Sequence, residues 1–168
     1  MFVIKDNRLK MYDISEEYKN YLRSFDNRVS KKEKRKFYGI LVSDSNFDYY
    51  IPFTSRTNKN TSSKLTVNIK DGKNVIAKLL LNNMIPVNME DSRIVDILKS
   101  KYRDYYIKEI SYLRSKKIQD EMLRKINNIF YVLEDTKHTD YIFFKKLCCD
   151  FRLLEEKCIE YKKSINYN

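Results

Sequence analysis

The sequence YYIPFTSR occupies residues 49–56 and changes abruptly from aromatic and apolar side chains to two hydroxyls and a cation. The aromatic and β-branched part favours a β-strand. Thr54, Ser55 and Arg56 would then stand where the chain leaves the sheet. Hydroxyl and guanidinium groups are hydrogen-bond donors that suit a phosphate. We therefore predict a strand that ends in an anion-binding site.

A basic segment precedes this strand at residues 28–36 and has the sequence RVSKKEKRK. It leads directly into FYGILV at residues 37–42, a second run with the composition of a strand. The cations of the segment are Arg28, Lys31, Lys32, Lys34, Arg35 and Lys36. If the two apolar runs pair as neighbouring strands, their polar ends meet in one cleft. An ordinary solvated loop is the alternative explanation for such a basic run.

The charge balance indicates a polyanionic partner. The 168 residues include 34 Lys and Arg against 23 Asp and Glu, which gives a formal charge of +11. Such an excess favours binding to nucleic acid or to an acidic protein surface. Codon usage in an A+T-rich genome is another source of lysine, but it predicts an even scatter rather than a cluster at residues 28–36.

Cysteine usage and hydropathy favour a soluble, cytoplasmic protein that does not enter a membrane. Cys148, Cys149 and Cys158 are odd in number and include an adjacent pair, which is not typical of a disulfide framework. There is no C-x-x-C, and His138 has no companions at ligand spacing, so no metal site is expected. No stretch approaches the ~20 apolar residues of a membrane helix, and the N-terminus lacks an apolar signal core.

The order of elements indicates an α+β fold in one domain, residues 1–168. Ser15 is a candidate N-cap for a short amphipathic helix, and strands are expected at 37–42, 47–53, 65–69, 73–80 and 84–87. A long helical region follows from residue 107 to 133, with a break near 115–117. A last helix after Thr139 would face the core through Leu147, Phe151, Leu154, Cys158 and Tyr161.

Several catalytic devices are absent from the sequence. There is no G-x-x-x-x-G-K, no G-x-G-x-x-G and no H-E-x-x-H, and a single histidine excludes a two-histidine mechanism. RNA cleavage by its own 2′-hydroxyl needs none of these and no cofactor. The enzyme has to align the RNA, stabilise the growing negative charge and move protons. Lys, Arg, Ser, Thr and Tyr side chains suffice for that chemistry.

Four segments resemble successive motifs of the ToxN/AbiQ family of endoribonuclease toxins from type III toxin–antitoxin systems. They are YxISxxYxxYLxxFDxxV at residues 12–29, RKFYGI at 35–40, IPFTS at 51–55 and LNxMIPV at 81–87. A looser likeness covers residues 151–158. The resemblance implies a compact antiparallel sheet or small barrel, related to the MazF/Kid fold, with a helical C-terminal half packed against it.

The resemblance also implies an activity and partners. Family members cut single-stranded cellular or phage RNA without metal and act in abortive infection. They are inhibited by a structured, repeat-derived antitoxin RNA, which they also process, and an RNA-bridged cyclic assembly is expected. The family's catalytic groups fall on Thr54, Ser55, Tyr18, and either Arg35 or Lys36. The remaining RNA-binding groups are expected at Tyr21, Arg28, Lys31, Lys32, Lys34, Arg56 and Lys59.

The sequence departs from the family pattern after the hydroxyl pair. Relatives commonly place a lysine directly or two residues after it, whereas here Arg56 follows and Lys59 comes later. The identity of the catalytic cation therefore stays open at this point. Tyr18 also lies on the apolar face of its helix, where core packing is the alternative to nucleotide positioning. Two other functions stay open as well: a non-catalytic RNA-binding protein, and an adaptor whose basic face binds an acidic protein.

Overall fold

The computed structural model describes residues 1–4, 9–30, 39–57 and 61–166. All seven described strands come before the longest helices, as the sequence predicts. In chain order the elements are β1 (Tyr12–Ile14), α1 (Glu16–Phe25), β2 (Gly39–Ser43), β3 (Asp48–Thr54), β4 (Thr66–Asp71), β5 (Asn74–Leu80), β6 (Ile85–Val87), β7 (Ser92–Ile94), α2 (Arg103–Leu113), α3 (Lys116–Glu134), α4 (Tyr141–Leu147) and α5 (Phe151–Asn166), with 3-10 turns η1 (Leu81–Asn83), η2 (Met89–Asp91) and η3 (Ile97–Lys99).

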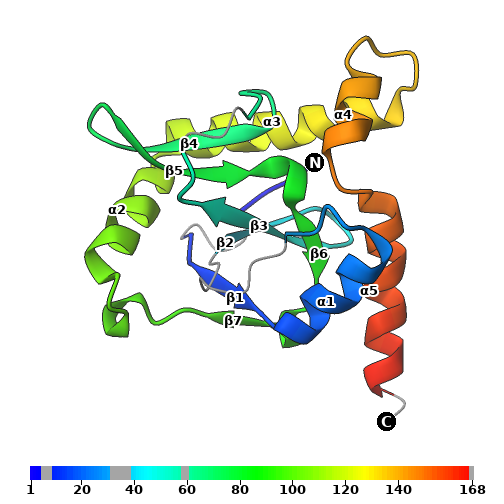
Figure 1. The fold of residues 1–168 in the computed structure, drawn as a ribbon, viewed down its shortest axis with the longest axis horizontal. Coiled ribbons are helices and arrows are strands. Elements are labelled where there is room, and N and C mark those ends of the chain that lie inside the picture. Colours follow the sequence, from blue (N-terminus) through cyan, green and yellow to red (C-terminus); the bar gives the residue numbers. More distant parts are fainter. Residues whose placement is uncertain (5–8, 31–38, 58–60, 167–168) are drawn as a thin grey trace.

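The described strands form one antiparallel, seven-stranded sheet in the order β4-β5-β3-β2-β1-β7, and β6 also pairs with β3 (Figure 1). Strand β3 is its centre. It pairs with β2 along one edge. Along the other edge, its first residues pair with β6 and its last residues pair with β5. The sheet is open, with β4 and β7 at the two ends of the order. The predicted antiparallel sheet is therefore confirmed, the small barrel is wrong, and the relation to the MazF/Kid fold stays a prediction.

Strand β3 is buried on both faces, which explains its nearly continuous apolar sequence. Because successive side chains of a strand alternate, Tyr49, Ile51 and Phe53 share one face. On that face the Tyr49 ring packs against Phe130 of α3 and Phe151 of α5. Tyr50, Pro52 and Thr54 share the opposite face, which we call the site face because it carries the predicted hydroxyl.

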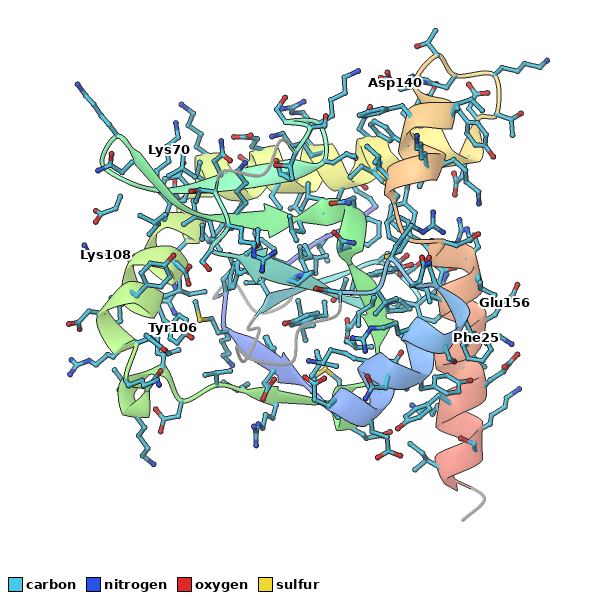
Figure 2. The ribbon with its side chains drawn as sticks, in the orientation of Figure 1. Phe25, Lys70, Tyr106, Lys108, Asp140 and Glu156 are labelled. Carbon is cyan, nitrogen blue, oxygen red and sulfur yellow. The ribbon has the colours of Figure 1, made fainter. Side chains whose placement is uncertain are left out.

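The helices pack around the edges and back of the sheet. In Figure 1, α3 runs alongside the β4–β5 hairpin, and α5 stands beside α1 and β6. Helix α1 begins where the sequence predicts, because the Ser15 hydroxyl accepts a hydrogen bond from the Tyr18 amide at 3.2 Å. Charged side chains such as those of Lys70, Lys108 and Glu156 lie on the outside of the molecule (Figure 2). No helix among the described residues is long and apolar enough to cross a bilayer.

The predicted last helix is in fact broken between α4 and α5. Cys148 has an extended conformation, with φ −84° and ψ 149°. The Cys149 amide donates to the Asn82 carbonyl at 2.9 Å, and the Asp150 amide donates to Asp26 Oδ2 at 2.6 Å. These bonds to distant parts of the chain replace the intrahelical bonds of a continuous helix. Leu147 is consequently 37% exposed rather than core-facing, whereas the rest of the predicted stripe is buried.

Candidate functional site

The end of β3 presents two of the predicted side chains to solvent. The Thr54 hydroxyl accepts a hydrogen bond from the Arg56 amide at 3.2 Å, and the Thr57 amide donates to the Ser55 carbonyl at 3.1 Å. These bonds fold the chain into a tight turn as it leaves the sheet. Thr54 is only 3% exposed, whereas Ser55 and Arg56 are exposed. Thr54 therefore holds the turn, and Ser55 and Arg56 are the groups that a ligand can reach.

The cations proposed to face Ser55 lie outside the described residues. These are Arg35 and Lys36, and with them the RNA-binding candidates Lys31, Lys32, Lys34 and Lys59. The topology nevertheless supports the meeting of the two segments. Gly39, the first residue of β2, pairs with Pro52 of β3, and the strands run antiparallel. The beginning of β2 therefore lies toward the end of β3 that carries Ser55.

Hydrogen bonds hold the described part of the basic segment, residues 28–30, against the rest of the fold. Arg28 Nε and Nη2 donate to Asp26 Oδ1 and Oδ2 at 2.8 and 2.9 Å. Hydrogen bonding to Asp26 raises the pKa of Arg28, which stays a cation. The guanidinium of Arg23 donates to the carbonyls of Val29 and Ser30 at 3.2 and 2.6 Å. Arg28 is thus committed to an ion pair, and its contact with RNA stays a prediction.

Tyr18 lies in the core rather than in an open cleft. Its side chain has no exposed surface, its hydroxyl donates to the Pro86 carbonyl at 2.7 Å, and its ring lies 5.0 Å from that of Tyr161. Burial, with a smaller contribution from Cys158, raises the pKa of Tyr18 above its ordinary value. A base cannot stack on a ring without exposed surface. In this structure the tyrosine joins α1 to β6, and the core-packing alternative describes its position.

Tyr21 is the partly exposed tyrosine of the same helix. Its ring lies 5.1 Å from Phe25 and 4.8 Å from Tyr161 of α5. Burial and, less strongly, the charge of Glu160 raise its pKa. Tyr21 thus belongs to the contact between α1 and α5, and its proposed role in RNA binding stays a prediction.

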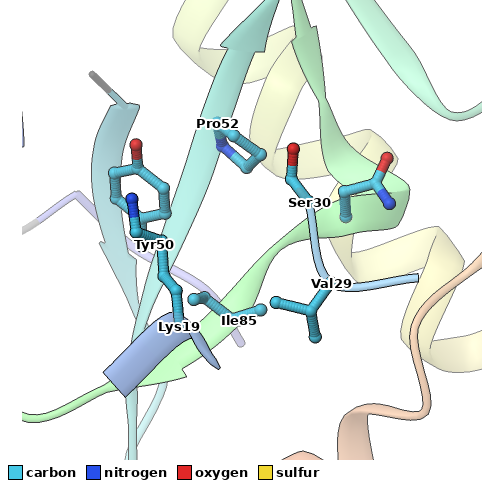
Figure 3. A pocket seen from close by; sticks show the side chains of 7 residues that line it. Lys19, Val29, Ser30, Tyr50, Pro52 and Ile85 are labelled. Atoms are coloured by element: carbon cyan, nitrogen blue, oxygen red, sulfur yellow. The ribbon is translucent and has the colours of Figure 1, made fainter. Parts of the chain in front are cut away.

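A small hollow lies on the site face next to the predicted site (Figure 3). Its lining combines apolar and polar side chains: Lys19, Val29, Ser30, Tyr50, Pro52, Asn83 and Ile85. Lys19 is 7% exposed, and its ammonium group contacts Glu16 Oε1 at 2.5 Å. Pro52 precedes Thr54 by two positions on β3, so both side chains point to the same face. The hollow therefore lies beside the turn that carries Ser55.

Lys78 is a cation of this region that the sequence analysis did not single out. It lies on β5 directly opposite Thr54, so both side chains point to the site face. Its ammonium group donates to the Thr61 hydroxyl at 3.1 Å. The strands expected at 65–69 and 73–80 are present and form the β4–β5 hairpin, but no sequence signal indicates that β5 also pairs with β3. Among the described residues, no group of three or more His, Cys, Asp or Glu side chains is arranged to hold a metal ion.

Comparison with known proteins gives consistent matches along most of the chain. Residues 10–159 match the family model for the toxin ToxN of type III toxin–antitoxin systems. The chain is 34% identical over 171 aligned positions to endoribonuclease ToxN of Bacillus thuringiensis subsp. kurstaki, covering 95% of this chain and 87% of that protein. It is 25% identical to endoribonuclease AbiQ of Lactococcus lactis subsp. lactis, covering 95% and 92%.

Solved structures agree with these matches. One, from work on selective toxin inhibition by a non-coding RNA pseudoknot in type III systems, superposes with a TM-score of 0.84 at 33% identity and covers 92% of this chain and 98% of its own. The AbiQ structure, described as a lactococcal anti-phage endoribonuclease, superposes with a TM-score of 0.75 at 25% identity and covers 93% and 99%. The chain therefore belongs to the ToxN family of type III toxin–antitoxin toxins.

Proposed function

We propose that this protein is an endoribonuclease toxin that cleaves single-stranded RNA at the turn following β3. Its membership of the family and the endoribonuclease activity of two relatives support this function. The observation that carries the location is the exposure of Ser55 and Arg56 at the end of an otherwise buried strand. Residues 1–168 form one catalytic domain in this proposal.

The proposed reaction is a transesterification within the RNA. The 2′-oxygen attacks the adjacent phosphorus, the bond from phosphorus to the 5′-oxygen breaks, and the products carry a 2′,3′-cyclic phosphate and a 5′-hydroxyl. One proton leaves the 2′-hydroxyl and one is delivered to the 5′-oxygen. The Ser55 hydroxyl and the Arg56 guanidinium bind the non-bridging oxygens, where charge grows in the transition state. Arg35 or Lys36 adds a further cation, and no metal takes part.

The proposed partners are RNA molecules. The substrates are cellular or phage RNA, and the inhibitor is a structured antitoxin RNA that the toxin processes from a repeated precursor. A pseudoknot RNA inhibits the toxin in the solved relative, and AbiQ acts against phage, which supports these roles. The antitoxin occupies the same surface as the substrate, and protein and RNA alternate in a closed assembly in the cytoplasm.

Replacing the exposed hydroxyl tests the proposal. Ser55→Ala should abolish growth arrest in cells that lack the antitoxin, and should slow cleavage of single-stranded RNA in vitro by ~10²- to 10³-fold. Ser63→Ala removes an exposed hydroxyl from the same connection between β3 and β4 and should leave both unchanged. Growth arrest by Ser55→Ala as severe as that of the wild type would remove Ser55 from the mechanism.

The cleavage products separate the enzyme from the RNA-binding alternative. Wild-type protein should leave RNA fragments with 2′,3′-cyclic-phosphate ends in the presence of EDTA. Tight binding without such ends would identify a non-catalytic RNA-binding protein. Binding to RNA should also weaken log-linearly as salt rises, because phosphate contacts release counterions. Negligible RNA affinity at physiological salt would instead favour an acidic protein partner.

A further inference from the structure

We propose that Lys78 is a phosphate-binding cation of the cleavage site, in addition to those that the family motifs indicate. The inference rests on the proposed function, because it places the ammonium group beside the phosphate held at Ser55. Lys78 and Thr54 are a directly opposed pair on β5 and β3. Such pairs have Cβ atoms about 4.5–5.5 Å apart on one face of a sheet. The cation therefore lies next to the residue that forms the turn.

The nearest neighbours of Lys78 within the sheet are uncharged. Its cross-strand neighbours are Thr54 on β3 and Asn68 on β4, and its neighbours along β5 are Ile76 and Leu80. Lysine is disfavoured inside a sheet, and partial burial of its charge costs free energy. A bound phosphate would lower that cost further. The partly exposed position of Lys78 lets an RNA phosphate reach it.

The contact with Thr61 directs the ammonium group toward the site. Thr61 belongs to the connection between β3 and β4, which begins with Ser55 and Arg56. The 3.1 Å bond from Lys78 Nζ to the Thr61 hydroxyl holds the cation between the two ends of that connection. A phosphate bound at the turn after Thr54 would therefore lie near the end of β3 where the cation is held.

A purely structural role, in which Lys78 only tethers Thr61, makes a different prediction. Such a role requires a hydrogen-bond donor but no positive charge. Lys78→Gln removes the charge and keeps a donor for Thr61, whereas Thr61→Val removes the acceptor and keeps the charge. The two variants therefore distinguish a contact with phosphate from a tether. Lys73→Met is the matched control, because Lys73 is an exposed lysine at the turn of the same hairpin.

Loss of the Lys78 charge should affect both RNA binding and RNA cleavage. With RNA made uncleavable by a 2′-deoxy nucleotide, Lys78→Gln should reduce the slope of log affinity against log salt by about 0.7, the contribution of one phosphate contact to a single strand. Single-turnover cleavage at saturating RNA should fall by ~10²-fold. Lys78→Arg should retain the salt slope and recover part of the rate. Lys73→Met and Thr61→Val should keep the wild-type slope.

Specific outcomes would overturn the inference. One is a Lys78→Gln protein with wild-type salt slope, and another is a Thr61→Val protein that loses as much cleavage as Lys78→Gln. Circular dichroism and thermal unfolding should show that each variant is folded. If Lys78→Gln does not fold, Lys78→Arg still tests the inference through its salt slope. The proposed function fails separately, if wild-type protein does not cleave RNA, and the salt slopes still decide whether Lys78 contacts phosphate.

Discussion

Arg28 and Asp26 form a two-point ion pair at the end of α1, with Nε–Oδ1 and Nη2–Oδ2 distances of 2.8 and 2.9 Å. The same carboxylate accepts the Asp150 amide at the start of α5, and Arg28 Nη1 donates to the Lys145 carbonyl of α4 at 2.9 Å. The pair therefore joins the N-terminal part of the chain to the break between the last two helices. It also fixes the segment that leads into the basic residues.

Removing the Asp26 charge should destabilise the protein most at neutral pH. Burial alone would raise the pKa of Asp26, but hydrogen bonds from Arg28 and two backbone amides outweigh it and lower that pKa below its ordinary value of 3.8. A depressed pKa contributes stability above the ordinary value, and this is lost as the pH falls through the folded pKa. Asp26→Asn should lower the free energy of unfolding at pH 7 by about 2 kcal/mol.

The pH dependence gives the control for this prediction. Urea unfolding between pH 7 and pH 2.5 should show that the difference between wild type and Asp26→Asn shrinks as the pH falls. Asp120→Asn removes an exposed carboxylate paired with Lys116 and should change the free energy by less than about 0.5 kcal/mol. A difference that stays constant over the whole pH range would contradict the ion-pair explanation.

Local sequence signals predicted the elements that local chemistry determines. The Ser15 cap and the apolar strands β3 and β5 appear as expected. Strands β1 and β7 were not predicted, because three residues are too few to show an alternation, whereas the equally short β6 lies in a run of apolar residues at 84–87. The break before α5 was missed for a different reason. It depends on bonds from Asn82 and Asp26, which lie far from Cys148 in sequence.

The candidate site likewise combines features set by local sequence with features set by distant contacts. The exposure of Ser55 follows from a strand that ends at a predictable position. The position of Lys78 depends on the pairing of β5 with β3, a non-local contact that periodicity does not reveal. Tyr18 shows the converse problem. A tyrosine that matches a family motif can also be a core residue, and only its bond to Pro86 reveals which position it takes.

Tyr49→Phe should weaken the contact between the sheet and α5. The buried Tyr49 hydroxyl donates to Glu155 Oε1, and Arg152 Nη1 contacts the other oxygen of that carboxylate at 2.9 Å. Burial, together with the hydrogen bond to Glu155, raises the pKa of Tyr49. Phenylalanine would leave a buried oxygen without its donor, at a cost of about 1–3 kcal/mol in the free energy of unfolding.

Chemical denaturation of two matched variants measures this effect. Tyr131→Phe removes the same hydroxyl from a side chain that is 62% exposed, and should change stability by less than about 0.5 kcal/mol. Equal losses from both variants would show that the bond to Glu155 does not stabilise the fold. The RNA-cleavage rate should not change in either variant at temperatures where both are folded.

Glu109→Gln should stabilise the protein at high pH. Glu109 on α2 is 3% exposed, and burial raises its pKa to about 7, against a smaller opposing effect of a hydrogen bond from Tyr105. Between its ordinary value of 4.5 and about 7, the folded state binds a proton that the unfolded state has lost. Stability therefore falls as the pH rises through this window, and the full penalty, about 3 kcal/mol, applies above it.

The measurement compares unfolding free energies at pH 5 and pH 8. Glu109→Gln should gain about 2 kcal/mol relative to wild type between the two pH values, because glutamine cannot ionise. Glu90→Gln, at an exposed position, should follow the wild-type profile. If Glu109→Gln and wild type lose stability in parallel, the buried carboxyl is not the group that titrates.

Gly39→Ala should disturb the pairing of β2 with β3, on which the proposed cleavage site depends. A Cβ atom at residue 39 would lie 2.3 Å from the Ile51 carbonyl oxygen and 2.4 Å from the Tyr50 ring, so the backbone of β2 would have to move. We expect a loss of about 2–3 kcal/mol in the free energy of unfolding. Gly72→Ala is the control, because its φ of +59° strains an alanine but nothing lies within 4 Å. It should cost only about 1–2 kcal/mol and leave RNA cleavage intact.

Gly39 pairs with Pro52, two residues before Thr54, so cleavage by folded Gly39→Ala protein should also fall. Wild-type cleavage by that protein would show that the site tolerates a shift of β2.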